Sequence, residues 1–149
     1  MTQSLIRARF GLGIWGLVSV GFSLIFFLGG GAVTYADDSI RMGIAALILG
    51  TGFVSYVSMI YLTREKSNGK TLISDERDLE ISRHADQISL VAVLVFVYSV
   101  SIALFLSYET AGSLPVSWMW FLAYVTGCFG LLSHAVITLA LHREMSGNG

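Results

Sequence analysis

Residues 88–107 read ISLVAVLVFVYSVSIALFLS, an apolar run without a charged side chain. A helix needs about 20 mostly apolar residues to cross the hydrocarbon core of a bilayer, which is about 30 Å thick. This run meets that length, and it lacks the polar–apolar alternation that is typical of membrane β-barrel strands. It therefore predicts a membrane-spanning helix.

Three further apolar runs occupy residues 10–33, 40–62 and 117–141, and none of them contains Asp, Glu or Lys. Of the 149 residues, 54% are hydrophobic and 13% are charged, whereas a soluble domain averages about 25% charged residues. We therefore predict an all-α integral membrane protein, a four-helix bundle that forms a single domain over residues 1–149. Its spans are expected at about 10–33, 40–62, 88–107 and 117–141, with one substantial polar loop at about 63–87.

Basic residues are distributed unequally between the two sides of this arrangement. Of the nine Lys and Arg residues, only Arg41 falls on the side of the two short connections. The others precede the first span, follow the last, or lie in the middle loop. Because cytoplasmic loops carry an excess of Lys and Arg, we expect both termini and the middle loop to be cytoplasmic. The third span should then continue into the cytoplasm as a helix.

The N-terminal run has one alternative interpretation, as a cleaved secretory signal. Arg7 and Arg9 precede the apolar residues, and the sequence Thr34-Tyr35-Ala36 resembles a signal-peptidase site. The apolar run is longer than the usual signal core of about 7–15 residues. We therefore expect it to be retained as a span.

Small residues recur at helical spacing in every span. Helices in lipid associate through close packing at small side chains, because lipid provides no hydrophobic drive between them. These residues are therefore candidates either for packing within the bundle or for an external docking face. The candidates are Gly16, Ser19 and Ser23 in the first span, Gly43 and Gly50 in the second, and Gly127 and Gly130 in the fourth.

His134 is the one strongly titratable side chain deep within a span, about two turns from its cytoplasmic end. An ionisable residue inside the membrane is a functional hypothesis by default. We expect His134, Ser99 and Ser55 to be buried polar residues, with His134 hydrogen-bonded to a hydroxyl on a facing helix. The alternatives are a pH-sensitive or substrate-contacting histidine, or a metal or haem ligand.

The sequence shows no pattern that is typical of catalysis. It has no Ser-His-Asp set, no paired catalytic carboxylates, no phosphate-binding glycine loop and no His-Glu-x-x-His motif. The single cysteine, Cys128, excludes an internal disulfide. We therefore expect no enzymatic activity, no cofactor and no metal site, and the net charge of −1 gives no reason to expect a nucleic-acid partner.

The middle loop contains a predicted helix start. Ser74 is a good N-cap residue, and acidic residues in the first helical turn complement the helix dipole. This charged segment is either a solvated juxtamembrane helix or a docking face for a protein. Its candidate docking residues are Asp75, Glu76, Arg77, Asp78 and Glu80.

The stretch Asp75-Glu76-Arg77-Asp78, followed by Ile81, Ala85 and Ser89 and then directly by a span, resembles a juxtamembrane pattern. The pattern is found in small multipass membrane proteins of unknown function from bacteria and archaea. The resemblance covers about 15 residues. It implies a prokaryotic four-span protein with a cytoplasmic loop, and it transfers no activity.

These patterns favour a non-enzymatic subunit, stabiliser or regulator of a larger membrane complex. The expected partners are the lipid bilayer and either another membrane protein or a second copy of the chain. An alternative is a small oligomeric transporter or channel, in which serine and threonine hydroxyls and His134 line a polar path. A further alternative is a membrane sensor or immunity-type protein that signals through its charged cytoplasmic helix.

Overall fold

The computed structural model describes residues 3–63 and 76–147, and in these ranges the chain is all-helical, without strands. This confirms the predicted all-α fold for the described part of the chain. Four of the helices are long and apolar enough to cross a membrane. The five helices are α1 (Gln3–Leu28), α2 (Ala32–Tyr35), α3 (Ser39–Leu62), α4 (Glu76–Tyr108) and α5 (Ser117–Gly147).

The first long helix ends earlier than its apolar run. Helix α1 stops at Leu28, and the chain then turns through Gly30 and Gly31, whose φ angles are 102° and 67°. Residues with side chains rarely adopt such left-handed backbone conformations, so these glycines permit the turn. The short helix α2 follows. The sequence predicted that the first span would continue to about residue 33 and be followed by a loop without a helix.

Helix α3 begins at a strong local signal. The carboxylate of Asp38 accepts hydrogen bonds from the backbone N–H groups of Ile40, at 3.1 Å, and Arg41, at 3.0 Å. These bonds satisfy two of the amide donors that have no partner within the helix. Asp38 therefore fixes where the chain re-enters the helical array.

Helix α4 is a single helix of 33 residues, about 50 Å long at 1.5 Å per residue. It is longer than a membrane core of about 30 Å requires. Its first residues belong to the charged segment, so that segment and the apolar run share one rigid element. The predicted cap residue Ser74 and the neighbouring Asp75 lie outside the described residues.

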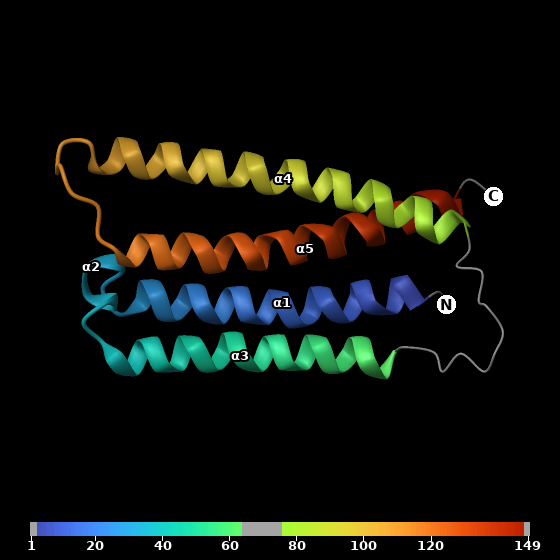
Figure 1. The fold of residues 1–149 in the computed structure, drawn as a ribbon, viewed down its shortest axis with the longest axis horizontal. Coiled ribbons are helices and arrows are strands. Elements are labelled where there is room, and N and C mark those ends of the chain that lie inside the picture. The colour runs from blue at the N-terminus through green and yellow to red at the C-terminus, as the bar shows by residue number, and fades with distance from the viewer. Residues whose placement is uncertain (1–2, 64–75, 148–149) are drawn as a thin grey trace.

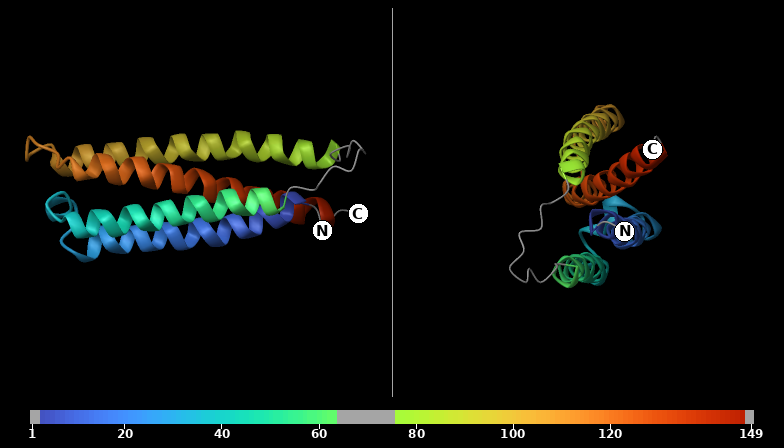
Figure 2. Two further views of the ribbon diagram at one scale, coloured as in Figure 1. Left: turned by 60° about the horizontal axis from the view of Figure 1, so that its bottom comes forward. Right: turned by 90° about the vertical axis from the view of Figure 1, so that its right-hand side faces the viewer.

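The four long helices form a row in the order α4, α5, α1, α3 rather than a closed, four-cornered bundle (Figure 1). Helix α1 packs against α3 and α5, and α5 also packs against α4. The end-on view in Figure 2 shows the same order, with α3 and α4 at opposite edges. Each edge helix therefore leaves most of its surface uncovered by the described chain.

The two ends of the row differ. Helix α1 begins and α5 ends at one end, which we call the terminal end. The opposite end, called the hairpin end, carries α2 and the connection at 109–116. This geometry agrees with the expectation that both chain termini share a side.

The core is centred on α1. At the hairpin end, Phe22 and Phe26 are almost fully buried together with Tyr35 of α2. The Phe26 and Phe121 rings lie 4.4 Å apart, which joins α1 to α5. In the middle of the row, Trp15 and Val18 pack with Cys128 of α5. Large aromatic and aliphatic side chains thus hold the centre of the row together.

Most of the glycines at close helix contacts are not the glycines that the sequence predicted. A Cβ added to Gly52 of α3 would clash with Val18 of α1, and one added to Gly21 would lie 3.5 Å from Ile48. Among the predicted glycines, only Gly130 has such a neighbour, with Val93 at 3.4 Å. An added Cβ would meet nothing within 4 Å at four others, so they are not internal contact points: Gly16, Gly43, Gly50 and Gly127.

Candidate functional site

A cavity of about 250 Å³ lies near the terminal end and is lined by residues of all four long helices. We call it the terminal-end cavity. Its inner wall is apolar, and its polar lining residues come from every helix of the row. These are Ser4 and Arg7 of α1, Tyr56 of α3, Ser82 of α4, and His134 and Thr138 of α5.

His134 lies within hydrogen-bonding distance of a carboxylate. Its Nε2 is 3.1 Å from Oδ1 of Asp86 on α4, and the two side chains are 39% and 67% exposed. The prediction that His134 is hydrogen-bonded to a hydroxyl group was wrong. The antiparallel packing of α4 and α5 instead brings Asp86 beside His134. The pair therefore links two helices at the boundary between charged and apolar sequence.

Arg7 is held at the cavity wall by the end of α3. Its Nε donates a hydrogen bond of 3.1 Å to Oγ1 of Thr63, and its Nη2 donates one of 3.4 Å to the Thr63 carbonyl oxygen. Beside it, Oγ of Ser4 lies 2.9 Å from Nε2 of His142. These contacts tie α1 to α3 on one side and to α5 on the other.

The described polar groups in the wall of this cavity are hydrogen-bonding groups without a metal cluster among them. Within residues 3–63 and 76–147, no three His, Cys, Asp or Glu side chains gather in a way that could hold a metal ion. The cavity presents a guanidinium, an imidazole and hydroxyl groups. Such groups bind anions and other hydrogen-bond acceptors.

The two serines predicted to be buried with His134 are not buried. Ser99 on α4 and Ser55 on α3 are both exposed, and neither lines the terminal-end cavity. Each edge helix packs closely against one long neighbour, so a polar residue on its other faces is left uncovered by the described chain. A continuous polar path through Ser55, Ser99 and His134 is therefore not formed within the described chain.

The small residues of the first span that were predicted to mediate packing lie in α1, inside the row of helices. Gly16, Ser19 and Ser23 are all partly buried. The Ser19 hydroxyl oxygen is enclosed without a hydrogen-bond partner among the described residues, as is Nε1 of Trp15. Ser19 and Trp15 are therefore enclosed, whereas a Cβ added at Gly16 would meet open space.

The hairpin end is organised around Arg41. Its guanidinium donates to the carbonyl oxygens of Ile25 and Phe26, in the last turn of α1, and of Gly29, the residue after the helix. Burial raises the pKa of the nearby Tyr35 hydroxyl above its ordinary value of 10.0; Tyr124 adds to this effect, and Arg41 opposes it. The lone basic residue on this side therefore has a structural role as a cap of α1.

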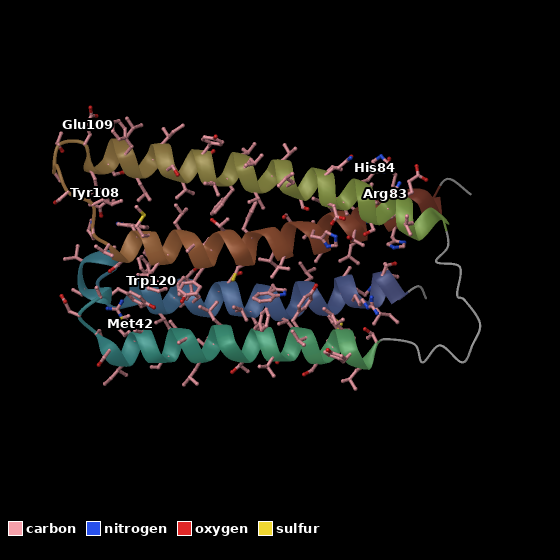
Figure 3. The ribbon with its side chains drawn as sticks, in the orientation of Figure 1. Met42, Arg83, His84, Tyr108, Glu109 and Trp120 are labelled. Carbon is pink, nitrogen blue, oxygen red and sulfur yellow. The ribbon has the colours of Figure 1, made fainter. Side chains whose placement is uncertain are left out.

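A second contact at the hairpin end joins α4 to α5. Nε1 of Trp118 donates a hydrogen bond of 2.8 Å to the hydroxyl of Tyr108. Figure 3 shows Tyr108 and Glu109 at this end, and Arg83 and His84 near the terminal end. Both ends of the α4–α5 pair are thus fixed by polar contacts.

The predicted docking residues fall on or before the first turns of α4. Glu76, Arg77 and Asp78 belong to the helix, and Asp75 lies outside the described residues. Glu80 is exposed. A docking role for this segment stays a prediction.

Sequence reasoning missed most of the polar groups that the fold brings together. Arg7 was interpreted as an orientation signal and as part of a possible secretory signal, and Asp86 as a loop charge. Distance from the span ends does not supply the missing signal. By the predicted bounds, Arg7 and Asp86 lie just outside their spans, whereas His134 lies seven residues inside the fourth.

Comparison of the chain with protein-family models, with curated proteins and with solved structures found no match. The resemblance of residues 75–89 to small prokaryotic membrane proteins therefore stays a prediction.

Proposed function

We propose that the protein is a non-enzymatic subunit, stabiliser or regulator of a larger complex in the cytoplasmic membrane of a prokaryote, with both termini cytoplasmic. The observation that carries this proposal is the open row, in which α3 and α4 form uncovered edges. The described residues form four long apolar helices, so lateral association within the membrane is the main way in which they can act on another protein.

The α3 edge is the better docking face of the two. Its outer side carries Gly43 and Gly50, with Leu47 70% exposed and Val54 64% exposed. These residues lie opposite Ala45, Gly52 and Met59, the residues of α3 that are buried. Glycines allow two helix backbones to approach closely in lipid.

The α4 edge differs in character. Its exposed residues are large and apolar, including Leu90, Leu94, Tyr98 and Phe105. Side chains of this kind suit contact with lipid chains and keep another helix at a distance. We therefore assign partner binding to α3 and lipid contact to the outer face of α4.

The test is affinity purification from the native membrane in a mild detergent, with quantitative mass spectrometry of the co-purifying proteins. The wild type is expected to retain another membrane protein or a second copy of itself. The double variant Gly43→Leu/Gly50→Leu should lose that partner, because bulky side chains separate the backbones. Gly43→Ala/Gly50→Ala is the matched control and should keep it.

Two results would contradict the proposal. One is a wild-type protein that purifies as a monodisperse monomer without partners. The other is a leucine variant that retains the same partners in the same ratio, since the α3 edge would then not be the contact.

The transporter or channel alternative draws support from the terminal-end cavity with its His134–Asp86 pair. Flux of ions or solutes through proteoliposomes tests it. Transport that is lost in His134→Gln and Asp86→Asn would favour this alternative over the subunit.

A further inference from the structure

The terminal-end cavity is lined by one arginine, Arg7 of α1. Among the described residues, the ion pairs are Arg41 with Asp38 and His134 with Asp86. Arg7 has no acidic partner in that part of the chain. Its two hydrogen bonds go to the neutral Thr63.

The orientation of Arg7 leaves part of its guanidinium available to a ligand. A guanidinium carries five N–H donors in a planar fork, and Thr63 uses the Nε donor and one donor on Nη2. A fork of this kind matches the oxygens of a carboxylate or phosphate group better than a lysine does. Because Thr63 also fixes the side chain, little further ordering is needed on binding.

The surroundings of Arg7 suit a single anionic group. Ser82 of α4 adds a hydroxyl to the wall, and His134 adds an imidazole whose Nε2 lies 3.1 Å from Oδ1 of Asp86. Asp86 itself is not among the residues that line the cavity. Among the described residues that line the cavity, Arg7 is the only Lys, Arg, Asp or Glu, so the lining presents a positive charge to a ligand.

The depth of the cavity indicates where the ligand comes from. Arg7 stands just before the apolar run that begins at Phe10, and Thr63 follows the last residue of α3. Both therefore lie at the edge of the apolar zone. Lipid headgroups occupy this level, and basic pockets between helices at this level bind anionic headgroups.

The size of the cavity restricts the ligand as well. Sites for drug-sized molecules measure about 300–1,000 Å³, and this cavity of about 250 Å³ is smaller. One water molecule occupies about 30 Å³ in the liquid. The cavity thus suits a phosphate group with its nearest atoms, while Gly11, Leu131 and Ala135 provide an apolar inner wall.

We propose that the terminal-end cavity binds the phosphate group of an anionic phospholipid, with the Arg7 guanidinium as its principal ligand and the Ser82 hydroxyl as a second donor. This site is separate from the α3 docking face, so each can fail without the other.

The experiment measures thermal unfolding of the full-length protein in detergent micelles containing increasing amounts of phosphatidylglycerol. Parallel arms use phosphatidylcholine, which carries phosphate without net charge, and inorganic phosphate, which lacks a lipid. Phosphatidylglycerol is expected to raise the unfolding midpoint with saturation, and the other two are expected to have little effect. Arg7→Gln should weaken apparent affinity by about tenfold, as expected for loss of one charged contact.

Arg9→Gln is the matched control, because Arg9 is exposed, lies two residues away and does not line the cavity. It should retain the wild-type response. Arg7→Lys keeps the charge without the fork and should show a smaller loss than Arg7→Gln. If Arg7→Gln fails to fold, Arg7→Lys still allows the response to phosphatidylglycerol to be measured.

Three results would overturn the proposal. Equal stabilisation by phosphatidylcholine would show that the headgroup charge is not recognised. An equal response to inorganic phosphate would identify a site for a free anion instead of a lipid. An equal loss in Arg9→Gln would show general attraction between basic residues and the lipid surface.

Discussion

The Nη1 of Arg41, near the start of α3, donates a hydrogen bond of 2.7 Å to the carbonyl oxygen of Gly29, which directly follows α1. The last carbonyl groups of a helix have no partner within it. Arg41 also donates to Ile25 and Phe26 from a side chain that is only 14% exposed. One arginine therefore closes the end of α1 and joins it to α3.

Arg41→Gln should lower the free energy of unfolding by about 2–4 kcal/mol, because several charge-assisted bonds are lost and partly buried carbonyl groups lose their partner. Denaturant titration in detergent, followed by circular dichroism, measures this. Arg9→Gln, at an exposed position, should change the value by less than about 0.5 kcal/mol. An Arg41 variant as stable as the wild type would contradict the capping role.

Gly52→Ala should destabilise the protein by about 1–3 kcal/mol, the usual cost of overpacking, because the new methyl group would clash with Val18. Gly50→Ala is the internal control on the same helix. Its Cβ meets nothing within 4 Å, so it should be neutral or more stable by up to about 1 kcal/mol. Equal effects at the two positions would show that α1 and α3 do not meet at Gly52. The same denaturant titration compares both variants.

The long apolar runs predicted the four long helices because length and the lack of charge are local properties of the sequence. Which face of a helix packs against its neighbour is not a local property of the sequence. Gly50 and Gly52 are both small and lie two residues apart, yet only Gly52 faces α1. Each span offers several such faces, and periodicity does not say which neighbour lies on which side.

The contacts of the candidate site could not be predicted for the same reason, because they depend on which helices pack together. His134 was recognised by its own sequence context, but Asp86 became its partner only through the pairing of α4 with α5. Arg7 and Thr63 are separated by most of two helices in the chain and meet only when α1 and α3 pack. Ser99 has the same sequence features as a buried polar residue, but the open row leaves its side of α4 uncovered.

Tyr108→Phe should lower the free energy of unfolding by about 0.5–1.5 kcal/mol, because Nε1 of Trp118 loses its acceptor. Tyr98→Phe applies the same change on the same helix at a side chain that is 68% exposed. It should have little effect. If both substitutions cost the same, the bond between Tyr108 and Trp118 contributes nothing specific. Thermal unfolding in one detergent measures all three proteins.

Alkaline pH should destabilise the protein partly through Tyr35. Burial holds the pKa of this hydroxyl above its ordinary value of 10.0, so the folded protein keeps a proton that the unfolded chain releases. The contribution to stability is therefore complete below about pH 10 and declines as the pH rises through the raised pKa. Between pH 8 and 12 the unfolding midpoint of Tyr35→Phe should fall less steeply than that of the wild type. Parallel curves would show that Tyr35 does not titrate differently in the two states.

The pair formed by Asp86 and His134 should contribute modestly to stability. Both side chains are more than a third exposed, and exposed ion pairs contribute about 0.2–1 kcal/mol. A double-mutant cycle with Asp86→Asn, His134→Gln and the double variant isolates the interaction from the other effects of each change. We expect a coupling free energy below about 1 kcal/mol. A coupling well above that value would show that the pair is shielded from solvent in the membrane. A value of zero would show that the two side chains do not interact.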